Sequence, residues 1–459
     1  MPRKRAPEGA NPLDGAGHME VLGVEIHGPS LEMTTETRPP PGAPIMACHE
    51  CGLIQRMRAL PDGGSARCPR CGAALYRERH ASIDRVLMLT LAALILFVLA
   101  HSFPFMSFSL EGREQVSTLL TGVVQLYRDG MWPLALLVFG AASLVPLLKL
   151  LGNLYVLLPL RLGRRPWGSA AVFRYAEVLH PWAMMEVYLL GVIVAYVKLT
   201  DLARLELGLA IYSFGALILV IIAAEAALDR RKVWERLGAQ AAVPPVWPAG
   251  PTVLSCHACD QLVRAGAPSH HVRLACPRCG AALHRRKPNS LARTWSLVLA
   301  ACILYVPANL LPVMTVTSFG RGEPDTILSG VQALIAAGMW PVALLVFFAS
   351  ITVPVLKLTG LTFLLVSVRR RSAWRPRDRT LLYRIIESVG RWSMVDIFMI
   401  SILVALVDLG SIATIEPGAG AVAFAAVVII TMLASMSFDP RLIWDRQETS
   451  HARQTAVRA

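Results

Sequence analysis

Residues 130–149 read GMWPLALLVFGAASLVPLLK. The pattern returns 208 positions later, where residues 338–357 read GMWPVALLVFFASITVPVLK. Neither stretch carries a charge before its final lysine, and each opens an apolar run long enough to cross a hydrocarbon core of ~30 Å. Because a membrane-crossing pattern is written twice, the chain is predicted to be a tandem duplication, an organisation common among transporters.

The repeat extends to both sides of these stretches. Cysteines precede both copies, as Cys48, Cys51, Cys68 and Cys71 and then as Cys256, Cys259, Cys276 and Cys279. After the second apolar run the offset becomes 210, which indicates a two-residue insertion or deletion in a loop. Charged residues that match at this offset include Arg174 and Arg384, Glu177 and Glu387, and Glu186 and Asp396.

The composition is typical of a membrane protein. Of the 459 residues, 54% are hydrophobic and only 17% are charged. The formal charge of +14 could suggest nucleic acid. However, the lysines and arginines lie in short blocks beside apolar runs, which is the pattern of residues that set membrane topology. We therefore expect a membrane-embedded protein without a nucleic-acid partner.

Eight apolar runs are predicted to be spans, and each is expected to be helical because a helix satisfies its own backbone hydrogen bonds in lipid. They cover residues 86–104, 132–160, 182–199, 207–228, 295–312, 340–368, 392–409 and 420–436. The predicted fold is an α-helical multi-pass membrane protein with two tandem four-helix modules. A small zinc-ribbon-like domain with four cysteines precedes each module.

The predicted segments follow from the repeat and from composition. They are a disordered tail (1–47), cysteine domain 1 (48–80), module 1 (81–236), a linker (237–255), cysteine domain 2 (256–286), module 2 (287–445) and a C-terminal tail (446–459). The first tail is rich in proline, glycine and charge and has no apolar region of a signal peptide.

Basic loops predict the orientation of the spans. Residues 161–180 hold four arginines and one glutamate, and residues 369–384 hold seven arginines and one aspartate. The opposite loops, 106–130 and 313–338, are poorer in arginine than in acids. By the positive-inside rule, both termini and both cysteine domains are expected in the cytosol.

Each cysteine domain has the form Cys-x2-Cys-x16-Cys-x2-Cys. This spacing predicts a site in which two knuckles hold one ion with four thiolates. A cytosolic location disfavours disulfides. Iron also accepts four thiolates but is less favoured than zinc. Because four protein ligands leave no open position for water, we expect two structural zinc ions and no zinc catalysis.

The knuckles differ in one residue. Gly52, Gly72 and Gly280 follow knuckle cysteines, where a residue without Cβ lets backbone N–H groups turn towards sulfur. Asp260 takes this place in cysteine domain 2. The second site is therefore expected to be slightly less regular.

Ionisable residues lie inside predicted spans of both modules. Lys149 and Lys357 fall in the second span of each module, and Glu186 and Asp396 fall near the cytosolic start of the third. Such residues usually serve a pathway or pair with each other. The alternative is a lysine that extends to the headgroups beside a structural carboxylate.

The lysines follow prolines by three residues in both modules. Pro146 and Pro354 can kink their spans and leave carbonyl groups that a lysine could satisfy, or around which substrate could pass. This recurrence favours function for Lys149 and Lys357. Lys149 lies ~26 Å from one end of its span and ~17 Å from the other, so its depth stays open between the cytosolic edge and the middle of the bilayer.

Arg174 and Glu177, like Arg384 and Glu387, lie three residues apart just before the third spans. They predict an interfacial helix that carries an i,i+3 ion pair. Binding of anionic headgroups is the sharper alternative.

Several motifs together carry a family resemblance. Residues 103–106 read FPFM and residues 311–314 read LPVM, GMWP opens each second span, and PLLK or PVLK lies within it. With the four-cysteine domains, these motifs resemble the paraquat-inducible protein A family over residues 48–445. The resemblance implies an inner-membrane protein of Gram-negative bacteria that works with a periplasm-spanning MCE-domain tunnel protein and moves phospholipid.

We therefore predict a lipid transport component that loads or extracts phospholipid for the tunnel protein, with movement coupled to protons. The alternatives are a non-transporting scaffold that anchors the tunnel protein and a thiol or iron redox membrane protein. No enzyme activity is expected, and no Gly-x-x-x-x-Gly-Lys-Ser/Thr motif for ATP occurs in the sequence.

Overall fold

A computed structural model describes most of the chain. The described residues are 25–27, 44–61, 63–78, 83–110, 113–200, 204–238, 252–265, 274–318, 321–407 and 413–445. Most of the predicted N-terminal tail, most of the linker and the whole predicted C-terminal tail lie outside them. Within the predicted tail, residues 25–27 form a strand that pairs with residues 65–67.

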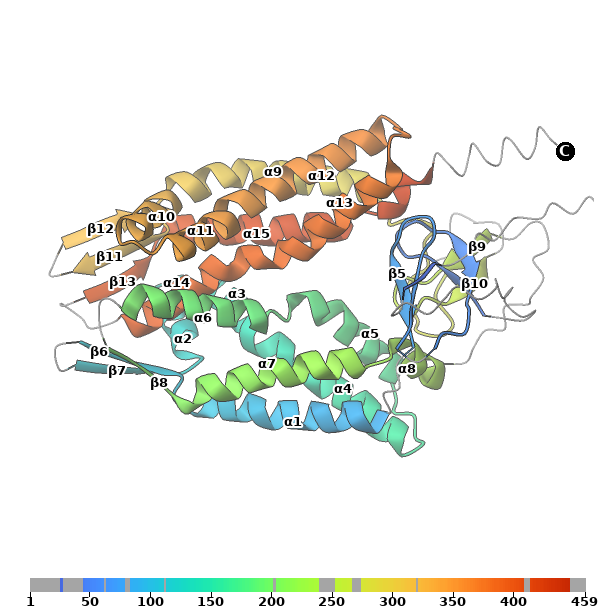
Figure 1. The fold of residues 1–459 in the computed structure, drawn as a ribbon, viewed down its shortest axis with the longest axis horizontal. Helices are drawn as coiled ribbons and strands as arrows, with labels where there is room; N and C mark the ends of the chain where they lie inside the picture. The colour runs from blue at the N-terminus through green and yellow to red at the C-terminus, as the bar shows by residue number, and fades with distance from the viewer. Residues whose placement is uncertain are drawn as a thin grey trace, which may run out of the picture.

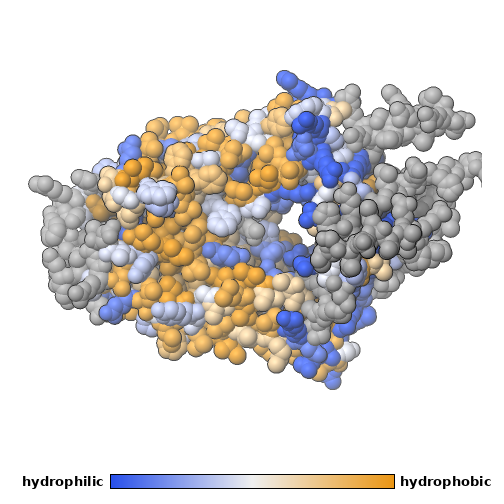
Figure 2. All heavy atoms as spheres, viewed as in Figure 1, coloured by the Kyte–Doolittle hydropathy of each residue, from blue (hydrophilic) through white to orange (hydrophobic). Residues whose placement is uncertain are grey.

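Among the described residues, eight helices are long and apolar enough to cross a membrane. They are Ile83–Ser102, Trp132–Arg161, Ser169–Thr200, Leu209–Ala227, Ser290–Leu310, Trp340–Arg369, Pro376–Leu406 and Ala419–Ser437. Hydrophobic residues cover much of the helical part, and hydrophilic residues gather where it meets the cysteine domains (Figure 2). The predicted fold class is confirmed.

Module 1 begins with a straight span and continues with a broken one. Its helices are α1 (Ile83–Ser102), α2 (Thr121–Arg128), α3 (Trp132–Phe139), α4 (Val145–Arg161), α5 (Ser169–Leu179), α6 (Met185–Thr200), α7 (Leu209–Ala227) and α8 (Arg230–Leu237). A π-helical turn, Gly140–Leu144, joins α3 to α4. Pro146, which cannot donate a backbone hydrogen bond, follows this turn immediately, and this places the irregularity where the sequence predicts a kink.

Module 2 repeats this order. Its helices are α9 (Ser290–Leu310), α10 (Ile327–Ala336), α11 (Trp340–Phe347), α12 (Val353–Arg369), α13 (Pro376–Val389), α14 (Val395–Leu406) and α15 (Ala419–Ser437). A π-helical turn, Phe348–Thr352, again precedes the proline, Pro354. The third span of each module is a helix pair, α5 with α6 and α13 with α14, that is longer than predicted and is interrupted by a 3₁₀ turn.

Two small antiparallel sheets lie at the end of the molecule opposite the cysteine domains (Figure 1). One has the order β7-β6-β8 and the other β12-β11-β13. Their strands are β6 (Met106–Leu110), β7 (Arg113–Ser117), β8 (Arg204–Leu207), β11 (Met314–Ser318), β12 (Arg321–Asp325) and β13 (Ala413–Pro417). In each sheet the central strand directly follows the first span, so the sheet ties the first hairpin to the segment before the fourth span.

The third spans pack against each other in the centre of the molecule. The side chains of α14 are buried throughout its length. Gly191 of α6 allows the close approach, because a Cβ there would lie 3.0 Å from the Cβ of Phe398. The ring of Tyr188 meets that of Phe398 edge to face, with 5.3 Å between the centroids. The interface between the modules is therefore centred on α14, which packs against α6 and also against α2 of module 1.

Short hairpins form the cysteine domains. Their strands are β1 (Glu25–His27), β2 (Ile45–Ala47), β3 (Ile54–Arg56), β4 (Ser65–Arg67), β5 (Ala74–Arg77), β9 (Thr252–Ser255) and β10 (Leu262–Ala265). β2 pairs with β3, and β9 pairs with β10, on either side of the first knuckle of each domain. Both domains lie at the same end of the helices (Figure 1).

Candidate functional site

The eight knuckle cysteines form two buried groups in the described part of the chain. The closest Sγ–Sγ distances are 3.5 Å for Cys48–Cys71 and Cys51–Cys68, 3.4 Å for Cys256–Cys279 and 3.6 Å for Cys259–Cys276. A tetrahedral ion with metal–sulfur bonds of ~2.3 Å separates its sulfurs by roughly 3.8 Å, whereas a disulfide holds them ~2.05 Å apart. Each group therefore fits one metal ion with four thiolate ligands.

All four knuckles close in the same way. In each of them, the residue after the second cysteine donates its backbone N–H to the carbonyl of the first, at 2.7–3.0 Å. The residue after the second cysteine has a positive φ, between 68° and 77° for Gly52, Gly72 and Gly280 and 55° for Asp260. Asp260 adopts the conformation that glycine favours, so the substitution does not change the turn.

The cysteine domains dock crosswise on the modules. One buried cluster joins the Cys48 group to Leu358, Tyr383 and Trp444 of module 2. A second cluster joins the Cys256 group to Phe173 and Trp234 of module 1. Each cysteine domain therefore packs against the module that it does not precede.

Matching arginines make the crossed contacts. Arg174 of α5 donates to the carbonyl of Cys279 at 3.0 Å, and Arg384 of α13 donates to the carbonyl of Cys71 at 2.8 Å. Arg384 Nε also donates to Glu50 Oε2 at 2.6 Å. Although burial opposes its charged form, hydrogen bonds from His49 and Arg384 hold the pKa of the Glu50 carboxyl below its usual value.

These partners differ from the predicted i,i+3 pairs. Arg174 of α5 contacts cysteine domain 2, and Glu177 Oε2 pairs with Arg230 Nε at 2.9 Å. The helix that carries them, α5, leads through the 3₁₀ turn His180–Trp182 into α6. Sequence reasoning could not find the cysteine-domain partners, because they lie more than 100 residues away.

Lys149 lies in a polar cluster of module 1. Its Nζ donates to Glu225 Oε1 of α7 and is 2.8 Å from Nδ1 of His180, at the break between α5 and α6. The Lys149 side chain is 12% exposed and that of Glu225 is 33% exposed. Glu225 is two residues from the end of α7, ~3 Å along its axis. This places the cluster towards the cysteine-domain end of the spans.

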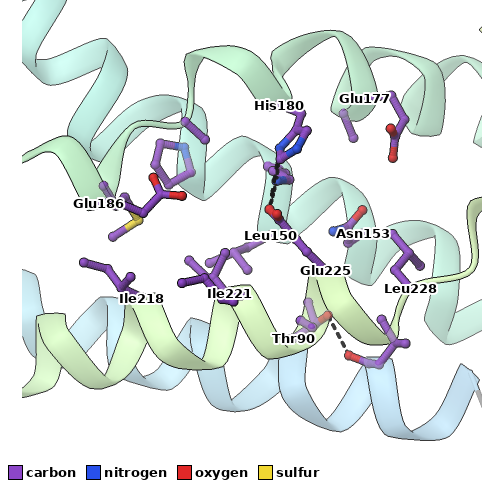
Figure 3. A pocket seen from close by; sticks show the side chains of 18 of the residues that line it. Thr90, Leu150, Asn153, Glu177, His180, Glu186, Ile218, Ile221, Glu225 and Leu228 are labelled. Carbon is purple, nitrogen blue, oxygen red and sulfur yellow. Dashed lines mark hydrogen bonds and ion pairs between the residues drawn. The ribbon is translucent and has the colours of Figure 1, made fainter. Parts of the chain in front are cut away.

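The cluster borders a hollow that is open to solvent, which we name the module 1 hollow (Figure 3). Its polar lining residues are Thr90, Lys149, Asn153, Glu177, His180, Glu186, Glu225 and Arg230. Its apolar lining includes Val86, Leu150, Ile218, Ile221 and Ile222. Pro146, which precedes Lys149 by one turn, also lines it. The structure thus places Pro146, Lys149, Glu177 and Glu186, which the repeat singled out, around one hollow.

Lys357 has different surroundings in module 2. Lys357 is 1% exposed, and its Nζ donates to Thr431 Oγ1 of α15 at 2.8 Å. Asp396, at the start of α14, is 4% exposed. Neither of its carboxylate oxygens has a hydrogen-bond partner among the described residues. The two charged positions that recur in the sequence are therefore fully buried in this module.

The sequence analysis missed His180, Glu225 and Thr431. Glu225 gave a usable signal, because it is an acid inside the predicted span 207–228. The residues predicted as site residues recur in both modules, whereas Ser435 stands at the position that matches Glu225. A partner that occurs in only one module gives no repeat signal.

A family model described as paraquat-inducible protein A matches residues 83–238 and 291–448. The chain belongs to the paraquat-inducible protein A family. The matched residues cover both modules, so the duplication is a property of the family match as well as of this sequence.

Relatives of this family match the chain over most of its length. The intermembrane transport protein PqiA of Escherichia coli is 34% identical and covers 89% of this chain and 97% of its own. The lipophilic envelope-spanning tunnel protein A of Escherichia coli is 32% identical, with 90% and 94% coverage. A probable intermembrane transport protein of Haemophilus influenzae is 29% identical, with 90% and 98% coverage. These names support a transport role in the cell envelope.

Proposed function

We propose that this chain loads or extracts phospholipid at the inner membrane for a periplasm-spanning tunnel protein of the MCE type. The observation that carries the proposal is the full-length match to relatives named for intermembrane transport and for an envelope-spanning tunnel. Eight apolar helices supply the membrane part. The cysteine domains and both termini lie in the cytosol, as the basic loops indicate.

The cysteine groups hold two structural zinc ions in this proposal. Four buried sulfurs satisfy a tetrahedral ion and leave no position for substrate or water. Their role is to lock each cysteine domain onto the opposite module. They take no part in lipid chemistry, and the protein is not an enzyme.

Movement of lipid is coupled to protons through the charged groups within the spans. Lys357 and Asp396 are buried in module 2, and buried ionisable groups in membranes are costly and often mark an ion or substrate pathway. Lys149 supplies a comparable group in module 1, next to two residues that can accept or share a proton. A proton gradient is therefore the expected energy source.

The test is lipid transfer with purified components. Liposomes that contain the full chain and fluorescent phospholipid are joined by the tunnel protein to acceptor liposomes, with and without a pH gradient. We expect transfer that needs both proteins and that changes when the gradient is removed. Complex formation without transfer above protein-free vesicles would contradict the proposal and favour a scaffold.

A further inference from the structure

We propose that the module 1 hollow binds a glycerophospholipid whose headgroup carries both a phosphate and a primary ammonium. The inference rests on the proposed lipid transport and names the class of lipid that module 1 takes. It follows from the charges, depth and walls of the hollow, and from a comparison with module 2.

The hollow presents both signs of charge at short range. Lys149 pairs with Glu225, and Arg230 pairs with Glu177 at 2.9 Å. Glu186 adds a third acid to the lining and is exposed. A phosphate fits the two basic groups, and an ammonium with three N–H donors fits the acids. A zwitterionic headgroup can therefore exchange partners with both members of each ion pair, whereas a purely anionic headgroup can replace only the acids and would displace them from their basic partners.

Depth and walls fit the rest of a lipid. Arg230 begins α8, just past the end of α7, and Val86 lies in the first turn of α1. The part of the hollow lined by Glu225 and Arg230 is therefore near the ends of two helices, at headgroup level. Ile218 lies ~14 Å along α7 from Ala227, its last residue, at 1.5 Å per residue, so the apolar wall continues into the hydrocarbon region. Figure 3 shows Ile218 and Ile221 on α7, across the hollow from His180, with Glu186 at the same end of the hollow as Ile218.

Module 2 shows that the fold itself does not require this polar lining. The lining residues Asn153, His180, Glu225 and Arg230 correspond to Leu361, Gly390, Ser435 and Pro440. Gly390 leaves room for the lysine, since a Cβ there would lie 3.3 Å from Lys357 Nζ. The same backbone thus places its lysine with a hydroxyl group and without a carboxylate. Glu225, His180 and Arg230 are therefore ionisable groups that module 1 has and module 2 lacks at the matching positions.

Binding is measured on the full chain in detergent, without the tunnel protein, by native mass spectrometry during titration with dilauroyl phosphatidylethanolamine. Parallel titrations use dilauroyl phosphatidylglycerol, dilauroylglycerol and soluble phosphoethanolamine. We expect the first lipid to bind about tenfold tighter than the other three. Equal affinity for phosphatidylglycerol or dilauroylglycerol overturns the inference, and equal affinity for phosphoethanolamine shows that a soluble amine phosphate, and no lipid, is the ligand.

Variants that give module 1 the residues of module 2 locate the site. Glu225→Ser and Asn153→Leu should each lower phosphatidylethanolamine affinity about tenfold and remove the preference over phosphatidylglycerol. The matched control is Ser435→Ala in module 2, which should retain the affinity of the wild type. Metal content and elution volume show that each variant is folded. Unchanged preference in both folded variants overturns the site, whatever the transfer assay shows.

The binding and transfer experiments fail independently. If the wild-type chain binds the zwitterionic lipid selectively but transfers none through the tunnel protein, the proposed function is wrong and the binding site stands. If transfer proceeds while binding lacks headgroup preference, the site assignment is wrong and the transport proposal stands.

Discussion

Lys149 and Lys357 occupy the same position of the repeat but have opposite surroundings. Lys149 meets His180 and Glu225 beside an open hollow. Lys357 is enclosed and bonds to Thr431. Each lysine follows the same π-helical turn and proline, so the backbone does not explain the difference. Duplication has kept the scaffold and the lysine while the partner side chains diverged.

Variants of the crossed cysteine domains should give the largest difference between the effects on module 1 and on module 2. Cys51→Ser should remove one of about two metal ions per chain and loosen module 2, because cysteine domain 1 packs on that module. Structural zinc contributes ~10–16 kcal/mol of binding free energy in small domains, so this is the largest expected effect. Metal analysis and limited trypsin digestion of loop 369–375, compared with loop 161–165, measure it.

Cys259→Ser is the reciprocal variant. It should also halve the metal content, but the faster digestion should appear in loop 161–165 of module 1. If each cysteine variant loosens the module that follows it in sequence, the crossed arrangement is wrong.

The lysines themselves give the next largest effect. Lys357→Ala should lower lipid transfer at least tenfold, because it leaves Thr431 Oγ1 without its charged donor and removes an ionisable group from a buried pathway. Lys149→Ala should also lower transfer, but should in addition lower lipid binding. Transfer assays paired with the detergent titration measure both. Normal transfer in both folded variants would remove the lysines from the mechanism.

The fold could be predicted from sequence because its signals are local or repeated. Spans follow from apolar runs, and the cysteine groups follow from spacing. The small sheets were not predicted. Each contains a hairpin of two five-residue strands, β6 with β7 and β11 with β12, which are short for a pattern to be read from sequence. The third strands, β8 and β13, pair nearly 100 residues away from β6 and β11, and such pairing leaves no local signal.

The site was only partly predictable for a related reason. The repeat identified Lys149, Glu177 and Glu186, because residues of the same charge stand at the matching positions of module 2. His180 and Glu225 have no such counterpart. Each cysteine domain could dock on either of two similar modules, and the tertiary structure has it dock on the opposite one. Sequence spacing does not indicate which module is contacted.

The docking arginines test the asymmetry on a smaller scale. Arg384 makes bonds to Glu50 and to the Cys71 carbonyl, whereas Arg174 makes one bond to the Cys279 carbonyl. Arg384→Ala should therefore cost about 2–3 kcal/mol of docking free energy and Arg174→Ala about 1 kcal/mol. Hydrogen exchange in each cysteine domain measures the difference. Equal protection in both variants would contradict the assignment of Glu50 as an additional partner.

Gly390 provides the smallest and most local test. Its φ of −56° is helical, so alanine meets no backbone strain there. The added Cβ would lie 3.3 Å from Lys357 Nζ and would displace the lysine by a few tenths of an ångström. Gly390→Ala should cost about 1 kcal/mol and lower transfer a few-fold, while Gly215→Ala, whose Cβ meets no atom within 4 Å, is the matched control. Thermal unfolding and transfer measure the two effects, and equal values for both variants would show that Lys357 tolerates other positions. Its role would then depend on its charge alone, and the tight enclosure that distinguishes module 2 from module 1 would not matter for transport.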